Sequence, residues 1–440
     1  MKILMLSQYP WKKDNSFGNT YSNIFGKIEN IEIAHIYLMA GRPDKEKVVT
    51  RYYQIPENEV FKTCAKPWKK NAGVGHVYML NDNDYDKDKA VPQTKVEKGF
   101  YGKLLGFGKR HHWSLMFLAR ELAWKMGKIN YPDLMKFVDD FQPDIFFLPF
   151  SNLYFTNRLA LYIKQHYDMP MVMYMAMDHY SLKRVSFNPV FWLDRFAKRR
   201  MIRKMSNYSE VIFAISKKLK FELEKGLDVR CEILYKRPDS NRKQSVYKPN
   251  DRKLKFLFTG NILSNRWKSL SLLVNALKKY EIGTLDIYTA NPISRRINKA
   301  LNIDGISIIH KPVSQNEVIK LQNAADVLVH AEGFDLYNKS LVRCAISTKI
   351  MDYLSVGRCI LAIGPRDISS IEYLKEHDLA LVACSRQELE IIVSDMVNNR
   401  EIISSYSHKG SDYATSYLNE ETLNSDFYVF LNTIVQNYNK

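Results

Sequence analysis

Short apolar runs alternate with longer segments of helical periodicity along most of the chain, which predicts repeated strand and helix units. In the N-terminal half, strands are expected at 3–7, 31–38, 145–149, 171–177 and 211–215, with helices near 154–167 and 191–207. A second series has strands at 254–259, 284–288, 306–309, 327–330 and 359–363, and helices near 268–280, 293–301, 314–324, 347–357, 386–399 and 418–436. Strands that are apolar throughout are typical of parallel sheets covered on both faces. The pattern predicts an α/β protein with two doubly wound parallel sheets, and residues 41–110 give no clear pattern.

A polar segment at 238–250 separates the two series and is typical of an interdomain linker. The chain of 440 residues is longer than one hydrophobic core usually supports, which also favours two domains. We expect a first domain at 1–245 and a second at 250–415. The remaining residues, 416–440, are expected to form a helix that packs back toward the first domain.

Composition indicates a globular protein, because 46% of residues are hydrophobic and no apolar run is long enough to cross a bilayer. Residues 1–7 fit a first strand better than a signal peptide. The five cysteines are widely spaced and form no metal-binding pattern, which predicts reduced thiols in a cytoplasmic protein.

The net charge of +18 is concentrated in the N-terminal half. Residues 1–250 contain 43 Lys and Arg against 26 Asp and Glu, whereas residues 251–440 contain 22 against 21. This asymmetry predicts an anionic partner for the first domain, such as an anionic membrane surface, a phosphorylated lipid or nucleic acid. Basic residues are interleaved with aromatic ones at 98–128 and in the helix near 191–207, where a solvated basic surface is the alternative interpretation. In this helix the candidate membrane or acceptor contacts are Trp192, Arg195, Lys198, Arg199, Arg200, Arg203 and Lys204.

The segment 347–363 carries the most informative chemistry, because it reads as a capped helix followed at once by a buried strand. Ser347 is a suitable N-cap and Gly357 a suitable C-terminal stop. Thr348 and Lys349 lie in the first turn, where free N–H groups and the helix dipole favour an anion. Asp352 lies on the same side one turn later. A phosphate at the helix start and a ribose at the carboxylate would fit this pattern.

The stretch from Lys349 to Ala362 resembles the nucleotide-sugar helix of GT-B glycosyltransferases, particularly the family-4 (group 1) enzymes. Segments 256–262 and 266–273 resemble the strand, loop and helix that hold the donor diphosphate, and 310–314 resembles the segment beside the base. The resemblance implies two Rossmann-like domains that face a central cleft. It also implies a donor contact at Gly18, which is expected in the loop after the first strand. The other implied donor contacts are Gly260, Asn261, Lys311, Glu332, Ser347, Thr348, Lys349 and Asp352.

The sequence departs from the family pattern at two places. Asn261 stands where many members carry Arg, so Arg266 and Lys268 are the candidates to neutralise the leaving diphosphate. Cys344 stands where the first of two family Glu residues is expected, and Glu332 can take that role if the loop is longer.

Catalytic candidates in the first domain are Asp178 and His179, at the end of the strand that resembles the family strand facing the sugar. The alternative is that Asp178 only caps the next segment. Asp-x-Asp pairs at 82–88 resemble a metal motif, but their alternation with Lys favours a solvated loop.

Together these features predict a glycosyltransferase that moves a sugar from a UDP- or GDP-sugar to a lipid-linked or glycan acceptor in polysaccharide biosynthesis. The resemblance implies a retaining reaction. The positive charge of the first domain predicts that it takes place at the inner face of the cell membrane. No cofactor or metal is expected, because cationic side chains would neutralise the diphosphate. Two alternatives remain: a nucleotide-sugar epimerase of the same fold, and a non-catalytic nucleic-acid-binding protein, although no helix-turn-helix, zinc module or aromatic RNA motif is evident.

Overall fold

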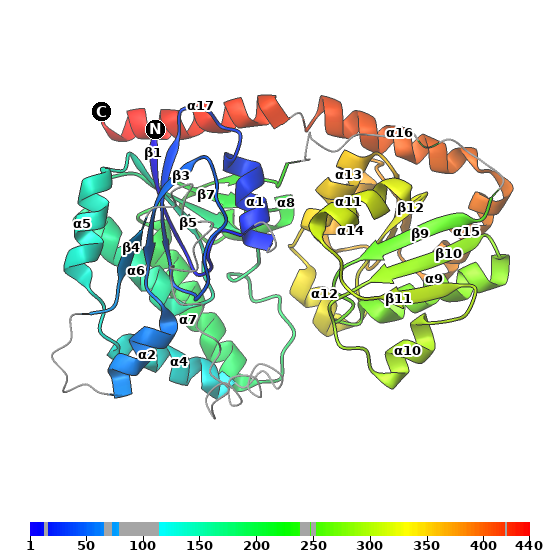
Figure 1. Cartoon of the computed structure of the whole chain (residues 1–440), viewed down its shortest axis with the longest axis horizontal. Coiled ribbons are helices and arrows are strands. Elements are labelled where there is room, and N and C mark those ends of the chain that lie inside the picture. The colour runs from blue at the N-terminus through cyan, green and yellow to red at the C-terminus, as the bar shows by residue number, and fades with distance from the viewer. Residues whose placement is uncertain (13–15, 66–72, 79–113, 238–246, 248–251, 419) are drawn as a thin grey trace.

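The computed structural model describes residues 1–12, 16–65, 73–78, 114–237, 247, 252–418 and 420–440. It contains two parallel β-sheets, each sandwiched between helices, with one sheet in each half of the chain (Figure 1). The predicted doubly wound α/β architecture is therefore confirmed.

The first sheet has eight strands, and every neighbouring pair except β3 and β4 is parallel. In spatial order its strands are β4 (His76–Tyr78), β3 (Val49–Gln54), β2 (Glu32–Tyr37), β1 (Lys2–Ser7), β5 (Ile145–Pro149), β6 (Met171–Met175), β7 (Val211–Ala214) and β8 (Arg230–Ile233). Its central strands β5, β6 and β7 are buried along their whole length, which explains their unbroken apolar sequences.

The second sheet has six parallel strands. In spatial order these are β11 (Ser307–His310), β10 (Gly283–Tyr288), β9 (Leu254–Thr259), β12 (Val327–Ala331), β13 (Cys359–Ile363) and β14 (Leu381–Ala383). The order reverses between β9 and β12, and open α/β sheets bind ligands at the carboxyl ends of the strands where the order reverses.

The helices of the first domain are α1 (Ser16–Phe25), α2 (Glu57–Ala65), α4 (Ser114–Met126), α5 (Tyr131–Phe141), α6 (Tyr154–His166), α7 (Pro189–Ser206) and α8 (Lys217–Glu224). Those of the second domain are α9 (Arg266–Tyr280), α10 (Arg295–Leu301), α11 (Gln315–Ala324), α12 (Leu336–Val342), α13 (Thr348–Val356), α14 (Ser369–Glu376), α15 (Arg386–Asn398) and α16 (Glu401–Ser416). The chain ends with α17 (Glu420–Tyr438).

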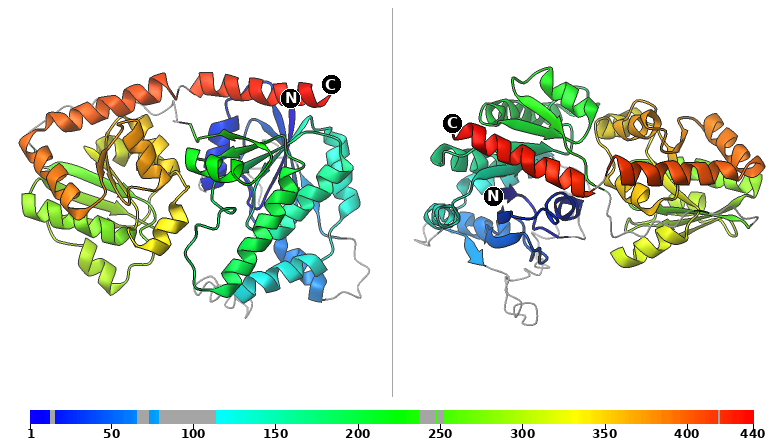
Figure 2. Two further views of the ribbon diagram at one scale, coloured as in Figure 1. Left: turned by 180° about the vertical axis from the view of Figure 1, so that it is seen from behind. Right: turned by 90° about the horizontal axis from the view of Figure 1, so that it is seen from above.

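The last two helices connect the two halves of the molecule. Helix α16 runs along the second domain, and α17 crosses back over the first, where its end lies near the N-terminus (Figures 1 and 2). Phe427 of α17 packs against Phe25 and Phe213, with ring centres 5.7 and 5.4 Å apart. These aromatic contacts add α17 to the core on one face of the first sheet.

The carboxyl ends of the second sheet's strands point toward the first domain (Figure 1). Loops of the first domain make hydrogen bonds there with α12 and the turn after it. The Ser216 hydroxyl donates to the Cys344 carbonyl at 2.7 Å, and the Val185 N–H donates to the Ser340 hydroxyl at 3.1 Å. The edge that the topology marks for ligand binding therefore faces the other domain.

Candidate functional site

A lysine and a glycine meet where β9 ends. The amine of Lys349 donates a hydrogen bond to the carbonyl of Thr259, the last residue of β9. The next residue, Gly260, has a φ of +138°, and a Cβ at this position would overlap the Lys349 amine. Residues other than glycine rarely adopt such a φ, and their Cβ would also displace the Lys349 amine, so both the backbone and the space favour glycine at this position. The contact fixes the start of α13 against the end of β9.

The environment of Lys349 lowers the pKa of its amine. Burial lowers the pKa of Lys349 to about 8, with a further contribution from the positive charge of Arg266. The carboxylates of Asp352 and Glu332 act in the opposite direction. These four side chains, Arg266, Glu332, Lys349 and Asp352, form one electrostatic unit that we call the charge cluster.

Arg266 and Glu332 are joined by two parallel hydrogen bonds. The Nε and Nη2 groups of Arg266 donate to the two carboxylate oxygens of Glu332 at 2.8 and 2.9 Å. Glu332 directly follows β12 and is only 4% exposed, and the Ser269 hydroxyl donates to its carbonyl at 2.6 Å. Such a fork-to-fork pair fixes both side chains in orientation. Arg266 thus brings a guanidinium group to the site, whereas Asn261 accepts a hydrogen bond from the Leu263 N–H at 2.7 Å within its own loop.

Asp352 is paired with a residue of the first domain. The amine of Lys236, three residues beyond β8, donates to a carboxylate oxygen of Asp352 at 2.6 Å, and both residues are buried. No local pattern in the sequence predicts this role for Lys236, because the two residues are 116 positions apart.

The start of α13 has the geometry expected of an anion site. Ser347 occupies the N-cap position, but its side chain makes no capping hydrogen bond, which differs from the usual role of such a serine. Thr348 is the first helical residue, and the first turn contains no acidic side chain. Gly357 ends the helix in the left-handed conformation as predicted, with a φ of +68°.

Asp178 lies in a dense network after β6. Its carboxylate accepts hydrogen bonds from the N–H groups of Tyr180 and Ser181 at 3.0 and 2.8 Å, and pairs with Arg195 at 2.9 Å and Arg343 at 3.4 Å. Burial alone would raise the pKa of Asp178, but Arg195 and the Ser181 hydrogen bonds outweigh it and hold that pKa below its usual value. Arg343 belongs to the second domain, so the network joins the domains. The carboxylate caps the next segment, as the alternative interpretation predicted, and also carries two ion pairs.

His179 has different surroundings. Its ring lies 5.4 Å from that of Phe150, centre to centre. Burial lowers the pKa of His179 to about 3, and the charges of Lys198 and Arg195 act in the same direction. The imidazole is therefore neutral at physiological pH and available to exchange hydrogen bonds with a sugar hydroxyl.

Three further predicted donor residues lie apart from the charge cluster. Lys268 is exposed on the first turn of α9, where its amine lies 5.8 Å from the Trp267 ring centre. Lys311 is exposed just after β11, beside His310, whose ring stacks on Tyr288 at 4.5 Å. Gly18 lies within α1 rather than in a loop, where a Cβ would collide with the backbone of Lys12.

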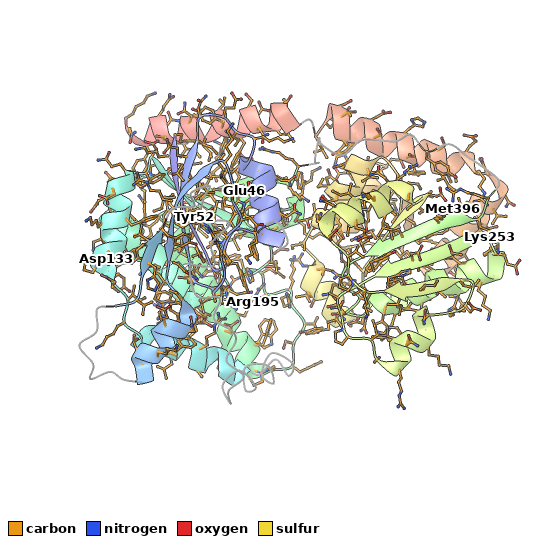
Figure 3. The ribbon with its side chains drawn as sticks, viewed as in Figure 1. Glu46, Tyr52, Asp133, Arg195, Lys253 and Met396 are labelled. Carbon is orange, nitrogen blue, oxygen red and sulfur yellow. The ribbon has the colours of Figure 1, made fainter. Side chains whose placement is uncertain are left out.

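The basic helix α7 divides into interior and exposed cations. Arg195, which is labelled in Figure 3, is 4% exposed and pairs with Asp178 at 2.9 Å, so it does not belong to a membrane-facing surface. Arg199 and Arg203 pack over the ring of Tyr180.

The other predicted membrane contacts of α7 also include side chains with partners inside the first domain and side chains that are exposed. The Trp192 indole donates to the Ser186 carbonyl at 2.9 Å, and Lys198 pairs with Asp194 at 2.7 Å. Arg200 and Lys204 line a shallow hollow of about 430 Å³. Among the described residues neither Arg200 nor Lys204 forms an ion pair, although Asp228 also lines this hollow.

Among the described residues, no group of three or more His, Cys, Asp or Glu side chains is placed to hold a metal ion. The Asp-x-Asp pairs at 82–88 lie outside the described residues. No described helix is long and apolar enough to cross a membrane.

No protein-family model matches the chain, and no curated protein matches it by sequence. Solved structures match over almost its whole length. HepE from Anabaena, in complex with UDP and glucose, has 12% identity and a TM-score of 0.59, covering 98% of this chain and 100% of its own. Sucrose-phosphate synthase from Thermosynechococcus elongatus has 9% identity and a TM-score of 0.60, covering 98% of both chains. WaaG, a glycosyltransferase involved in lipopolysaccharide biosynthesis, has 12% identity and a TM-score of 0.52, covering 96% of this chain and 98% of its own.

These similarities show that the chain has the GT-B fold, as predicted. In all three comparisons the shared architecture includes both domains, since each covers at least 96% of the chain.

Proposed function

We propose that this protein is a glycosyltransferase that uses a nucleotide-diphosphate sugar as donor. The observation that carries the proposal is the contact of Lys349 with Gly260 beside the Arg266–Glu332 pair. It places two cations at the carboxyl edge of a parallel sheet and at the start of a helix, where fixed positive potential stabilises an anion. HepE, which shares the fold, has been crystallised with UDP and with UDP-glucose.

Each member of the charge cluster has a role in this proposal. Arg266 and Lys349 neutralise the diphosphate, and Asp352 accepts hydrogen bonds from the ribose hydroxyls. Glu332 orients Arg266, and its proposed further role is to contact the sugar. Ser347 and Thr348 offer hydroxyl and N–H donors to the phosphate, and Lys311 is proposed to contact the base. Lys268 is not assigned to the donor, because its side chain lies with Trp267 on α9.

The transfer breaks the bond between the sugar C1 and the diphosphate oxygen and forms a bond from C1 to the acceptor oxygen. The acceptor proton passes to the departing diphosphate. The family-4 resemblance favours retention of configuration, and the cations favour a reaction without a metal. Neutral His179 would hold a sugar hydroxyl, while Asp178, whose oxygens are already occupied, would position the loop that carries it.

An acceptor at an anionic membrane surface is the partner that the first domain fits best. Around α7, the side chains of Phe187, Leu193 and Phe196 are 102%, 70% and 53% exposed. Exposed apolar side chains near unpaired cations such as Arg200 and Lys204 are typical of interfacial binding. We therefore infer a lipid-linked acceptor and peripheral attachment to the inner face of the membrane.

The test is a thermal-shift panel of UDP, GDP, ADP and CMP, with and without Mg²⁺. One nucleoside diphosphate is expected to stabilise the protein equally in both conditions, and Asp352→Ala and Lys349→Met are expected to abolish this effect. Lys253→Met is the matched control, because Lys253 lies at the end of the second domain far from the first (Figure 3). A panel without any shift would contradict the proposal.

A second assay separates transfer from epimerisation. The protein is incubated with the stabilising nucleotide's sugar conjugate, with and without anionic vesicles that contain a crude lipid-linked glycan fraction. Nucleotide release that depends on the acceptor is expected. Conversion of the nucleotide sugar to an epimer without acceptor would instead identify an epimerase.

A further inference from the structure

A second concave site lies in the second domain, between α9, α10 and the loop that joins β12 to α12. Its volume is about 740 Å³. The side chains that matter for its chemistry are Trp267 and Lys268 of α9, Arg296 and Lys299 of α10, and Phe334 and Asp335 of the loop.

Three cations line this pocket without an acidic partner. Lys268, Arg296 and Lys299 make no ion pair or side-chain hydrogen bond among the described residues. Two of them lie over one aromatic ring: the Arg296 guanidinium is 5.3 Å, and the Lys268 amine 5.8 Å, from the ring centre of Trp267. Like charges repel when they gather in this way, and an anionic ligand would relieve that repulsion.

The one carboxylate among the residues that line the pocket does not neutralise these cations. Asp335 accepts hydrogen bonds from the Asn265 side chain at 2.7 Å and from the Asn338 N–H at 3.1 Å, which caps α12. Apolar surface completes the pocket, since Trp267, Leu272 and Phe334 line it beside the cations. A positively charged wall next to aromatic rings fits an anion that is attached to a ring.

The pocket differs from the charge cluster. Arg266 and Lys268 are two residues apart on α9, which turns their side chains roughly 200° from each other. Arg266 reaches Glu332, whereas Lys268 lines the pocket. The loop between β12 and α12 is shared, because Glu332 and Phe334 are two residues apart in it.

We propose that this pocket binds a small soluble molecule in which a phosphomonoester is attached to a ring. The phosphate lies between Arg296, Lys299 and Lys268, and the ring lies against Trp267 and Phe334. Arginine and lysine together suit a phosphomonoester, because its oxygens accept several charge-assisted hydrogen bonds.

The test measures binding of phenyl phosphate by isothermal titration calorimetry, with phenol as the uncharged probe. Phenyl phosphate is expected to bind the wild type, and the double variant Arg296→Gln/Lys299→Gln is expected to bind it at least about tenfold more weakly. Arg295→Gln is the matched control, because Arg295 precedes Arg296 on α10 but does not line the pocket. Phenol is expected to bind neither protein.

UDP binding is measured on the same variants, so that the two proposals can fail separately. The double variant is expected to bind UDP like the wild type, and Lys349→Met to bind phenyl phosphate like the wild type. The pocket proposal is overturned if the wild type does not bind phenyl phosphate, if the double variant binds it equally well, or if Lys349→Met abolishes its binding. Melting temperatures equal to that of the wild type show that the exposed substitutions leave the fold intact.

Discussion

Lys236 and Asp352 form a buried ion pair between the two domains, with the amine 2.6 Å from the carboxylate oxygen. Lys236 follows the last strand of the first sheet, and Asp352 lies in α13 of the second domain. The carboxylate that we assign to the ribose is therefore held in place by the other domain. Any change in how the domains meet must also change the surroundings of the donor site.

Lys236→Met is expected to lower the free energy of unfolding by roughly 3 kcal/mol, because it leaves the Asp352 carboxylate buried without its partner. Unfolding in urea measures the change. Lys236→Met/Asp352→Asn is expected to recover part of the loss, since no charge is then left unpaired.

The control for this prediction is an exposed ion pair between the same two domains. Lys217 and Glu376 are 59% and 51% exposed, and Lys217→Met is expected to cost less than about 1 kcal/mol. Equal losses for the two lysine variants would show that burial of the Lys236 pair has no special effect.

Local sequence signals predicted the fold and the position of α13 well. The strands β5, β6, β9 and β13 are apolar throughout because both faces are covered, and this pattern depends on no distant partner. The end of α13 follows from Gly357, which acts within one turn of the helix, whereas Ser347 stands at the predicted N-cap position without a capping hydrogen bond. By contrast, residues 41–65 contain β3 and α2, in which polar residues interrupt the apolar pattern: Thr50, Arg51 and Gln54 lie in β3, and α2 is polar along most of its length.

Pairings between distant residues could not be predicted. Lys236 and Arg343 meet Asp352 and Asp178 across 116 and 165 positions, and neither lysine nor arginine carries a local mark of a buried partner. The burial of Arg195, by contrast, follows from a local spacing in the sequence. It lies seven residues before Ile202, which is two turns of helix, and Ile202 is fully buried on the same face of α7.

Gly260→Ala is expected to abolish the thermal shift with the nucleoside diphosphate. A methyl group at position 260 collides with the Lys349 amine, and the φ of +138° is unfavourable for alanine. Gly305→Ala is a control for a milder positive φ without a contact, because Gly305 has a φ of +68°, in the left-handed region that alanine enters at modest cost, and no atom lies within 4 Å of its Cβ position. We expect Gly305→Ala to cost about 1 kcal/mol in stability and to leave nucleotide binding unchanged. Nucleotide binding by Gly260→Ala at the wild-type level would contradict the assigned site.

Nucleotide affinity is expected to fall as the pH rises through about 8, where Lys349 loses its proton. Lys349→Arg is expected to bind with little pH dependence in this range, because arginine stays protonated. Calorimetric titrations with UDP between about pH 7 and 9 compare the two proteins. A parallel loss of affinity in both would assign the titration to another group.

The lowered pKa of Lys349 has the opposite effect on the stability of the fold, which is expected to rise with pH where nucleotide affinity falls. The pKa of Lys349 is lower in the folded protein than its ordinary value of 10.5, so the unfolded chain binds more protons between about pH 8 and 10.5. The contribution of Lys349 to stability is therefore unfavourable below pH 8 and is relieved as the pH rises through that window. Lys349→Met is expected to remove this contribution, which urea unfolding at roughly pH 7, below this window, and roughly pH 9.5, within it, can measure.

Phe187→Ser and Leu193→Ser are expected to weaken binding to anionic vesicles severalfold, because both side chains are more than half exposed beside the cations of α7. Arg200→Gln/Lys204→Gln is expected to weaken it further at low salt, since each surface cation contributes about 1 kcal/mol to attraction by anionic lipid. Cosedimentation with phosphatidylglycerol and phosphatidylcholine vesicles measures both effects. Ile391→Ser on α15, which is 60% exposed on the second domain, is the matched control. If that variant lost as much binding as Phe187→Ser, attachment would be a general property of exposed apolar residues, and α7 would not be the membrane-facing helix.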